Sequence, residues 1–298
     1  MKESNVQYKK FLGIENKSDH VRNSANAAKG LIALKYATNV DIDDKYMIHL
    51  KDGHSLIRAG RYRSGWTDGT NYYANKDGSL ISINPLTYEE TILMMGLGFT
   101  DITFVDTGKR ILFGNKMFIG QIKDGVATVL GTPTVTFKQT MPASDQLAFY
   151  NARLYAAIFD TVIYSDAVAT GRYDIRKPSL KFQGEVTLMA PVNGGVFFSD
   201  SAGTYFLEGS GPDKFIKKKI DTVCAKKGTV ARVDNLTFGF KEYKNALMWT
   251  STDGICIGGD GGMYENLTKD KYAMPAIFQG CAASIKKGEL IQYITIGA

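Results

Sequence analysis

The stretch VNGGVFFSDSAGTYFLEG, residues 192–209, contains two runs of apolar and aromatic residues, and each run follows a cluster of small polar residues. The first run follows Asn193-Gly194-Gly195, and the second follows Ser201-Ala202-Gly203. Gly194 and Gly195 supply the backbone conformations that a tight turn requires. Two β-prone runs separated by a turn of this kind predict a β-hairpin.

The same pattern of turns and short β runs recurs along the chain. The five copies begin at Trp66, Val105, Phe149, Val192 and Lys244. Their starts are separated by 39, 44, 43 and 52 residues. A period of about 40 to 50 residues, with several short strands in each unit, is typical of a β-propeller. We therefore predict an all-β chain that folds as a β-propeller of roughly five to six blades. A two-sheet sandwich is the alternative, and it accounts less well for the even period.

The two ends of the chain carry strand-like segments without partners of their own. These are DKYMIHLKDGHSLIRAG, residues 44–60, with a first strand near residues 47–50, and ELIQYITIG, residues 289–297. Pairing of the first and last strands would close the ring and remove exposed sheet edges. Residues 1–35 are polar and irregular, so they predict an extended N-terminal arm. Residues 36–298 then form the propeller domain.

The composition agrees with this fold and argues against several classes of function. The 298 residues include 31 glycines, 16 tyrosines and 16 phenylalanines, which favours many turns and aromatic-bearing strands. The net charge of +6 is mild, and the basic runs are short, so sequence-specific nucleic-acid binding is not expected. Cys224, Cys256 and Cys281 lack metal-site spacing and predict reduced thiols. No segment resembles a signal peptide or a bilayer-spanning run, which predicts synthesis in the cytoplasm and no membrane insertion.

The glycine-rich stretch WTSTDGICIGGDGG, residues 249–262, invites three interpretations. A phosphate-binding loop would need a following Lys and Ser or Thr at a helix start, which this stretch lacks. A calcium loop would need carboxylates at alternate positions, but Asp253 and Asp260 are seven residues apart. The third interpretation is structural. Asp253-Gly254 predicts a type I′ hairpin turn, and Gly258 and Gly259 begin the next turn. No cofactor or metal is expected.

The sequence contains no recognisable catalytic constellation. The three histidines, His20, His49 and His54, all lie near the N-terminus, and no third ligand accompanies the last two. No G-x-S-x-G elbow occurs, and no cysteine carries a local nucleophile signature. We therefore expect a protein that is not an enzyme and has no catalytic residues.

Three segments resemble a group of phage and prophage virion proteins: residues 33–57, residues 186–212 and residues 249–272. They carry the patterns NVDID, APVNGG followed by TYFLEG, and GICIGGDGG followed by NLT. At the level of fold the group is similar to the tail hub, or nozzle, proteins of short-tailed phages. The resemblance implies a β-propeller in the virion tail, a ring homo-oligomer for which a hexamer is the expected form, and no catalytic residues. It also implies portal, adaptor or other tail proteins as partners, with viral DNA passing through the lumen without sequence readout.

The N-terminal arm holds a short apolar cluster that predicts contacts between subunits. Its members are Tyr8, Phe11, Leu12 and Ile14. An extended segment with a few apolar anchors is suited to bind along a neighbouring subunit. Two alternatives to a structural virion protein stay open. One is a glycan-binding or glycan-degrading propeller, and the other is a host propeller that mediates protein interactions.

Overall fold

The computed structural model is built almost entirely of β-strands, which confirms the all-β prediction. It describes residues 56–233, 241–269, 271–272, 274, 280–287 and 290–297, together with the backbone of four short N-terminal strands. The helical segments of this part of the chain are the 3-10 turns η1 (Pro212–Lys214) and η2 (Asp260–Gly262). No described helix is long and apolar enough to cross a membrane.

Five four-stranded antiparallel sheets make up most of the described structure. The first sheet consists of β5 (Tyr62–Thr67), β6 (Tyr72–Lys76), β7 (Ser79–Ile83) and β8 (Glu90–Met94). The second consists of β9 (Thr103–Asp106), β10 (Ile111–Gly114), β11 (Ile119–Lys123) and β12 (Val126–Val129). The third consists of β14 (Leu147–Tyr150), β15 (Arg153–Ile158), β16 (Thr161–Tyr164) and β18 (Leu180–Lys181). The fourth consists of β19 (Leu188–Val192), β20 (Gly195–Asp200), β21 (Gly203–Glu208) and β22 (Ile216–Asp221). The fifth consists of β23 (Ala231–Arg232), β24 (Leu247–Ser251), β25 (Gly254–Gly258) and β26 (Tyr264–Asn266).

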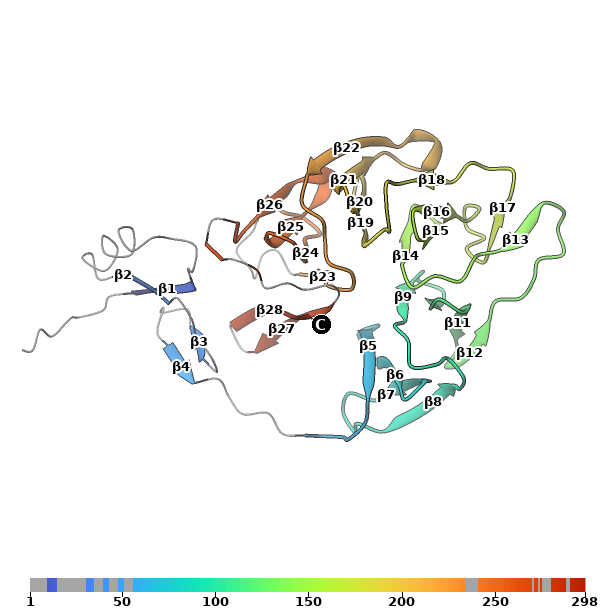
Figure 1. Ribbon diagram of the computed structural model, residues 1–298. Helices are drawn as coiled ribbons and strands as arrows, with labels where there is room; N and C mark the ends of the chain where they lie inside the picture. The colour runs from blue at the N-terminus through green and yellow to red at the C-terminus, as the bar shows by residue number, and fades with distance from the viewer. Residues whose placement is uncertain are drawn as a thin grey trace, which may run out of the picture.

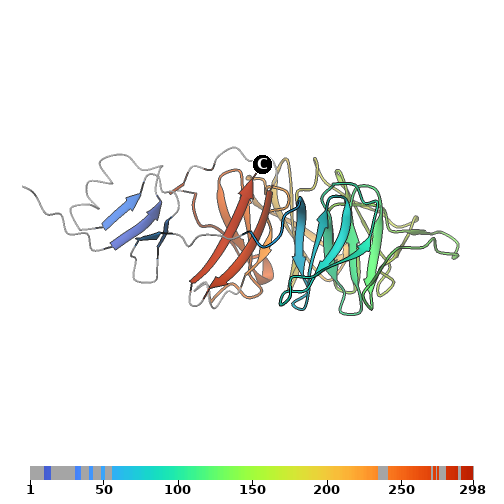
Figure 2. The same cartoon turned by 90° about the horizontal axis from the view of Figure 1, so that it is seen from below.

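The five sheets are arranged around a common axis (Figure 1). In each sheet the strand that comes first in the sequence is the innermost, and the later strands follow outward in order. Seen from the side, the strands of the first and second sheets run roughly along this axis (Figure 2). The arrangement is β-propeller-like, as the repeat predicted, and it has five separate sheets where the sandwich alternative has two.

Both faces of the sheets are buried, because neighbouring sheets pack face to face. In β20 the side chains of Val196 and Phe198 belong to the core shared with the third sheet. Phe197, which points to the opposite face, belongs to the core shared with the fifth sheet. Successive side chains of a strand point to opposite faces. This packing explains why a middle strand reads as a continuous apolar run instead of an alternating one.

The remaining strands form four smaller pairs. They are the antiparallel pairs β13 (Lys138–Thr140) with β17 (Arg172–Asp174), β27 (Gly280–Lys287) with β28 (Leu290–Gly297), and β3 (Val40–Ile42) with β4 (Ile48–Leu50), and the parallel pair β1 (Lys10–Ile14) with β2 (Leu31–Leu34). β4 lies where the first strand was predicted. β28 pairs with β27, which precedes it in a hairpin, and the predicted pairing of the C-terminal strand with an N-terminal strand stays a prediction.

The β27–β28 hairpin packs against the fifth sheet. The backbone N–H of Gly280 donates to the carbonyl of Lys227 at 2.8 Å. The Tyr293 hydroxyl donates to the carbonyl of Thr229 at 2.5 Å, and the Thr250 hydroxyl donates to that of Thr295 at 3.1 Å. In Figure 1 the hairpin lies between the fifth sheet and the first.

Candidate functional site

The glycines predicted at the turn of residues 192–195 lie at the β19–β20 connection. Asn193 and Gly194 form the turn, and Gly194 has a left-handed φ of +88°. Gly195 begins β20, where a Cβ atom would meet the carbonyl oxygen of Leu207 and approach the Phe206 ring to 2.6 Å. One glycine is therefore required by backbone conformation, and the other by the close approach of β21.

The turn between β24 and β25 differs from its prediction. Ser251 pairs with Gly254, so the central residues are Thr252 and Asp253, and neither has a positive φ. The prediction of a type I′ turn centred on Asp253-Gly254 is therefore wrong. The Ser251 hydroxyl accepts from the Asp253 N–H at 3.2 Å and donates to the Gly254 carbonyl at 2.9 Å, which fixes the turn one residue earlier. Gly254 itself has a φ of +147°, and a Cβ there would meet the Asn266 side chain.

The second half of the glycine-rich stretch joins the fourth sheet to the fifth. Gly258 ends β25, and a Cβ there would come within 2.8 Å of the Trp249 ring and 2.9 Å of the Phe197 ring. These two rings lie 5.4 Å apart between their centroids, one from each sheet. Gly259, the next residue, approaches Tyr243 so closely that a Cβ would lie 3.2 Å from its Cα.

Asp260 binds side chains from both of these sheets. Its carboxylate accepts hydrogen bonds from the backbone N–H of Asn193 at 2.9 Å and from the amide of the same residue at 3.0 Å. On its other side it accepts from the amide of Asn245 at 2.9 Å. The GGDGG loop is thus an inter-sheet joint, which agrees with the structural interpretation of these residues.

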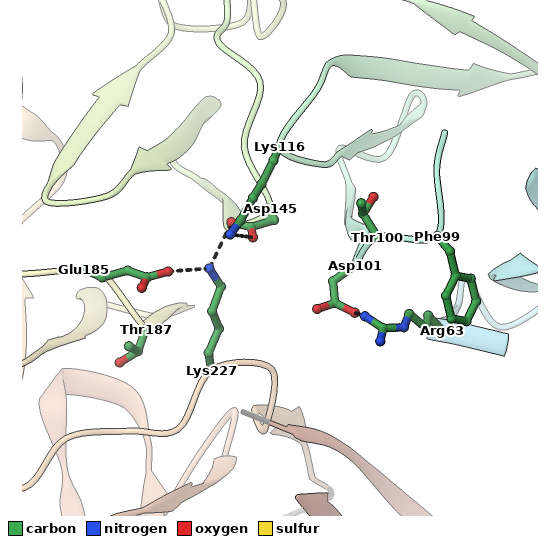
Figure 3. Close-up of a pocket in the computed structure, with 9 residues that line it drawn as sticks. All are labelled: Arg63, Phe99, Thr100, Asp101, Lys116, Asp145, Glu185, Thr187 and Lys227. Atoms are coloured by element: carbon green, nitrogen blue, oxygen red, sulfur yellow. Dashed lines mark hydrogen bonds and ion pairs between the residues drawn. The ribbon is translucent and has the colours of Figure 1, made fainter. Parts of the chain in front are cut away.

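A cavity of about 450 Å³ opens near the axis, where loops from all five sheets converge. Figure 3 shows its lining. The charged residues of the lining are three cations and three anions: Arg63, Lys116, Lys227, Asp101, Asp145 and Glu185. We treat this axial cavity as the candidate site because it gathers more charged side chains than the other cavity described below.

Lys227 binds two of the three carboxylates that line the axial cavity. It precedes β23, and its ammonium group lies 3.1 Å from Asp145 Oδ1 and 2.7 Å from Glu185 Oε1. Asp145 precedes β14 and Glu185 precedes β19, so one lysine ties together the third, fourth and fifth sheets. Burial alone would lower the pKa of Lys227, but the hydrogen bond to Glu185 and the charge of Asp145 outweigh it, so this pKa is raised. The lysine therefore stays charged at neutral pH.

The other two cations bind neighbouring loops. Lys116, in the β10–β11 turn, lies 3.8 Å from Asp145 Oδ2, and its side chain is 73% exposed. Arg63, in β5, lies 3.3 Å from Asp101 Oδ1 in the connection to the second sheet. The Arg63 guanidinium also stacks 4.7 Å from the centroid of the Phe99 ring. Each charged residue of the lining thus has an opposite charge as its partner.

The sequence contains a signal for the axial cavity that is not a catalytic or metal-binding motif. An acidic residue stands shortly before the innermost strand of three successive sheets: Asp101 before β9, Asp145 before β14 and Glu185 before β19. In a propeller these positions converge on the axis. Aligning the repeats at their first strand would have placed the three carboxylates together, although it would not have identified their lysine.

The chemistry that this arrangement offers is ion pairing. The Asp145 and Glu185 carboxylates both accept a hydrogen bond from the ammonium group of Lys227. Among the described residues no group of three or more His, Cys, Asp or Glu side chains has a geometry that could hold a metal ion. Cys224, Cys256 and Cys281 are all free thiols, and burial raises the pKa of Cys256.

Some of the predicted site residues lie outside the described part of the chain. These are Tyr8, His20 and His54, and the same applies to the side chains of Phe11, Leu12, Ile14 and His49, of which only the backbone is described. Phe11, Leu12 and Ile14 belong to β1. Their predicted role in subunit contacts stays a prediction.

No protein-family model and no curated protein matches the sequence. Solved structures match with low identity. A structure of a nidogen/laminin complex is 13% identical, with a TM-score of 0.43, over 78% of this chain and 90% of that one. PorZ of Porphyromonas gingivalis is 13% identical, with a TM-score of 0.45, over 87% of this chain and 36% of that one. U3-55K is 11% identical, with a TM-score of 0.48, over 78% and 72%. Since no TM-score among these reaches 0.5, the function has to be argued from this chain's own residues.

Proposed function

We propose that this chain is a structural, non-catalytic β-propeller that acts by binding other proteins. The observation that supports it best is the ion pairing of the axial cavity, where each of the six charged lining residues lies against a residue of opposite charge. General acid–base catalysis needs a group that can exchange a proton with a bound substrate. Carboxylates bound to lysine or arginine across the sheet junctions are better suited to stabilising the ring of sheets.

The proposed setting is a bacteriophage virion, in the tail hub or in the ring that connects head and tail. The sequence resemblance of residues 33–57, 186–212 and 249–272 supports this setting. Apolar side chains on the outermost strands are compatible with it. β8 and β12 contact each other, and they leave Ile92, Val126 and Val129 more than half exposed. Exposed apolar surface of this kind often marks a protein–protein contact.

We also propose that the propeller closes through a sixth sheet made from both ends of the chain. In the first, third and fourth sheets the outermost strand is followed in the sequence by the innermost strand of the next sheet, as β8 is by β9 and β22 is by β23, while β13 of the ribbon stands between β12 and β14. By this rule β27 is the innermost strand of a sixth sheet and β28 is its second. β4 ends at Leu50 and precedes β5, so β3 and β4 have the positions of the third and outermost strands. They lie radially outward of β27–β28 in Figure 1 and beside this hairpin in Figure 2.

In this proposal identical subunits form a closed ring around the tail axis. Head-to-tail contacts between identical subunits must either close into a ring or grow into a filament, and a conduit for DNA requires the ring. The DNA would pass through the lumen of the subunit ring. It would not pass along the axis of one propeller, where Lys227, Asp145 and Glu185 bind one another.

A reconstruction of the particle that contains this chain tests the proposal. We expect density for several copies arranged as a ring around the tail axis. Density at a fibre tip or as an isolated spike would contradict the virion part of the proposal. Release of sugars from host surface polysaccharide by the purified chain would contradict the non-catalytic part and favour a glycan-degrading propeller.

A further inference from the structure

A second cavity, of about 330 Å³, lies between the second sheet and the β13–β17 ribbon. Its volume is within the range of small-molecule sites, which is about 300–1,000 Å³. Leu130, Pro133 and Ala169 form the apolar part of its lining. The charged part consists of Arg110 and Arg172, with no acidic residue in the lining. This composition contrasts with the balanced charges of the axial cavity.

Arg110 is held in place without being neutralised. It lies in the turn before β10, and its guanidinium donates to the side-chain oxygen of Gln121 and, at 2.9 Å, to the hydroxyl of Thr170. Both partners are neutral. Among the described residues Arg110 forms no ion pair with a carboxylate. An arginine fixed in this way is pre-organised to bind an anion, because its planar group needs little further ordering.

Arg172, at the start of β17, carries a buried donor that is not satisfied. Its Nε atom is buried and has no hydrogen-bond partner among the described residues. The nearest carboxylate oxygen, Asp166 Oδ2, is 3.9 Å away. That carboxylate group already binds Lys138 at 2.7 Å and Lys177 at 3.3 Å. Because two lysines already share this carboxylate, its contact with Arg172 at 3.9 Å leaves the guanidinium of Arg172 incompletely neutralised.

We propose that this cavity binds an oxyanion, a carboxylate or phosphate group, on a small organic ligand. The guanidinium groups of Arg110 and Arg172 bind the anionic group. Paired N–H donors of a guanidinium match two oxygens of a carboxylate or phosphate. Leu130, Pro133 and Ala169 cover the carbon part of the ligand. The site is independent of the axial cavity and of the proposed place in a virion.

Thermal unfolding and calorimetric titration with two probes, inorganic phosphate and succinate, test the proposal. Ionic strength is held constant with sodium chloride. We expect at least one probe to raise the Tm in a saturable way, because a ligand that binds only the folded chain stabilises it. The probe with the lower Kd identifies the preferred anion. The absence of saturable binding for both probes would overturn the proposal.

Substitutions in the lining test whether the anion binds in this cavity. Arg172→Gln and Arg110→Gln should each weaken binding at least tenfold, while Arg61→Gln, which removes an exposed arginine just before β5, should leave the Kd unchanged. Gly131→Leu is a second approach for the case in which an arginine variant fails to fold. Nothing lies within 4 Å of a Cβ at Gly131, so leucine should fill the cavity without disturbing the fold. Equal weakening by Arg61→Gln, or unchanged binding in Gly131→Leu, would contradict the assignment.

Discussion

Gly258 allows two large rings from different sheets to meet. Trp249 and Phe197 are both fully buried, and their rings approach the Gly258 Cα closely enough to exclude any side chain. Trp249 carries the largest of the fully buried side chains, so its position affects the junction between the fourth and fifth sheets. At this position the constraint is space, since no left-handed φ is recorded for Gly258.

We expect Gly258→Ala to destabilise the chain by about 1–3 kcal/mol, the usual cost of forcing extra atoms into a packed core. The measurement is urea unfolding. Gly131→Ala is the matched control, because a Cβ at Gly131 meets nothing within 4 Å. An equal effect of the two substitutions would mean that the general effect of replacing glycine by alanine, and not the ring contact, decides the cost.

Tyr73 makes the free energy of unfolding depend on pH in the alkaline range. Burial first, and then the hydrogen bond to Asp68 at 2.9 Å, raise the pKa of the Tyr73 hydroxyl to about 12. The unfolded value is about 10. The protonated hydroxyl is therefore favoured in the folded state. Its stabilising contribution is complete below pH 10 and is lost as the pH rises from 10 to 12.

We expect the free energy of unfolding to fall more steeply between pH 10 and 12 in the native chain than in Tyr73→Phe. The difference between the two isolates this residue from other buried tyrosines. Tyr72→Phe, which changes a half-exposed neighbour, is the control and should follow the native curve. If Tyr73→Phe has the native slope, the Tyr73–Asp68 contact does not contribute to the pH dependence.

Residue types at turns could be predicted from the sequence, but their partners could not. Gly194 and Gly254 were placed in turns because glycine in a polar cluster between β runs is a local signal. The predicted type I′ turn at Asp253-Gly254 is wrong because the Ser251 hydroxyl bonds to the Asp253 N–H and to the Gly254 carbonyl, which moves the turn one residue earlier. The bonds from Asp260 to Asn193 and Asn245 join residues far apart in sequence, so no local pattern could indicate them.

At the scale of elements, Lys227 couples three sheets through partners of different exposure. Its own side chain is 18% exposed and that of Asp145 is 13% exposed, so their contact is screened little by water. Lys116 reaches the same carboxylate from solvent at 3.8 Å. Loss of a partner from a buried ion pair leaves a charge uncompensated, whereas loss of an exposed pair costs little.

We expect Lys227→Met to destabilise the chain by about 1–3 kcal/mol, because two carboxylates lose their shared cation. Lys116→Met should change the stability by less than about 0.5 kcal/mol. Urea unfolding at neutral pH compares them. Lys227→Met combined with Asp145→Asn should recover part of the loss. If the double variant is no more stable than Lys227→Met, the lysine acts by packing and not by charge.

The strands could be predicted from the sequence better than their pairings. Each of the five repeats falls within one four-stranded sheet, since hairpins pair strands that are close in sequence. The partner of β28 was predicted from the need to close a ring. Its pairing with β27 follows the same local hairpin rule, and the strand at residues 280–287 is not among those predicted from the sequence.

At the scale of the whole molecule, the β27–β28 and β3–β4 pairs are smaller than the five sheets. Five sheets have four strands each, while β27–β28 and β3–β4 have two each. β27 contacts β23 as the innermost strands of neighbouring sheets do, for instance β14 with β19. A two-stranded sheet with an open edge exposes unpaired backbone groups and invites aggregation. Joining β3–β4 to β28 would satisfy that edge and give a sixth sheet of the same size.

Two N-terminal truncations distinguish a closing hairpin from a free arm. Removal of residues 1–35 takes away the predicted arm but keeps β3 and β4, so we expect a Tm close to that of the full chain. Removal of residues 1–55 also takes β3 and β4 and should lower the Tm by more than about 5 °C, equivalent to roughly 2 kcal/mol, or cause aggregation. Amide hydrogen exchange across β28 should remain slow in the first truncation and become fast in the second. If the chain without residues 1–55 melts like the full chain and keeps β28 protected, the propeller does not use its N-terminal strands to close.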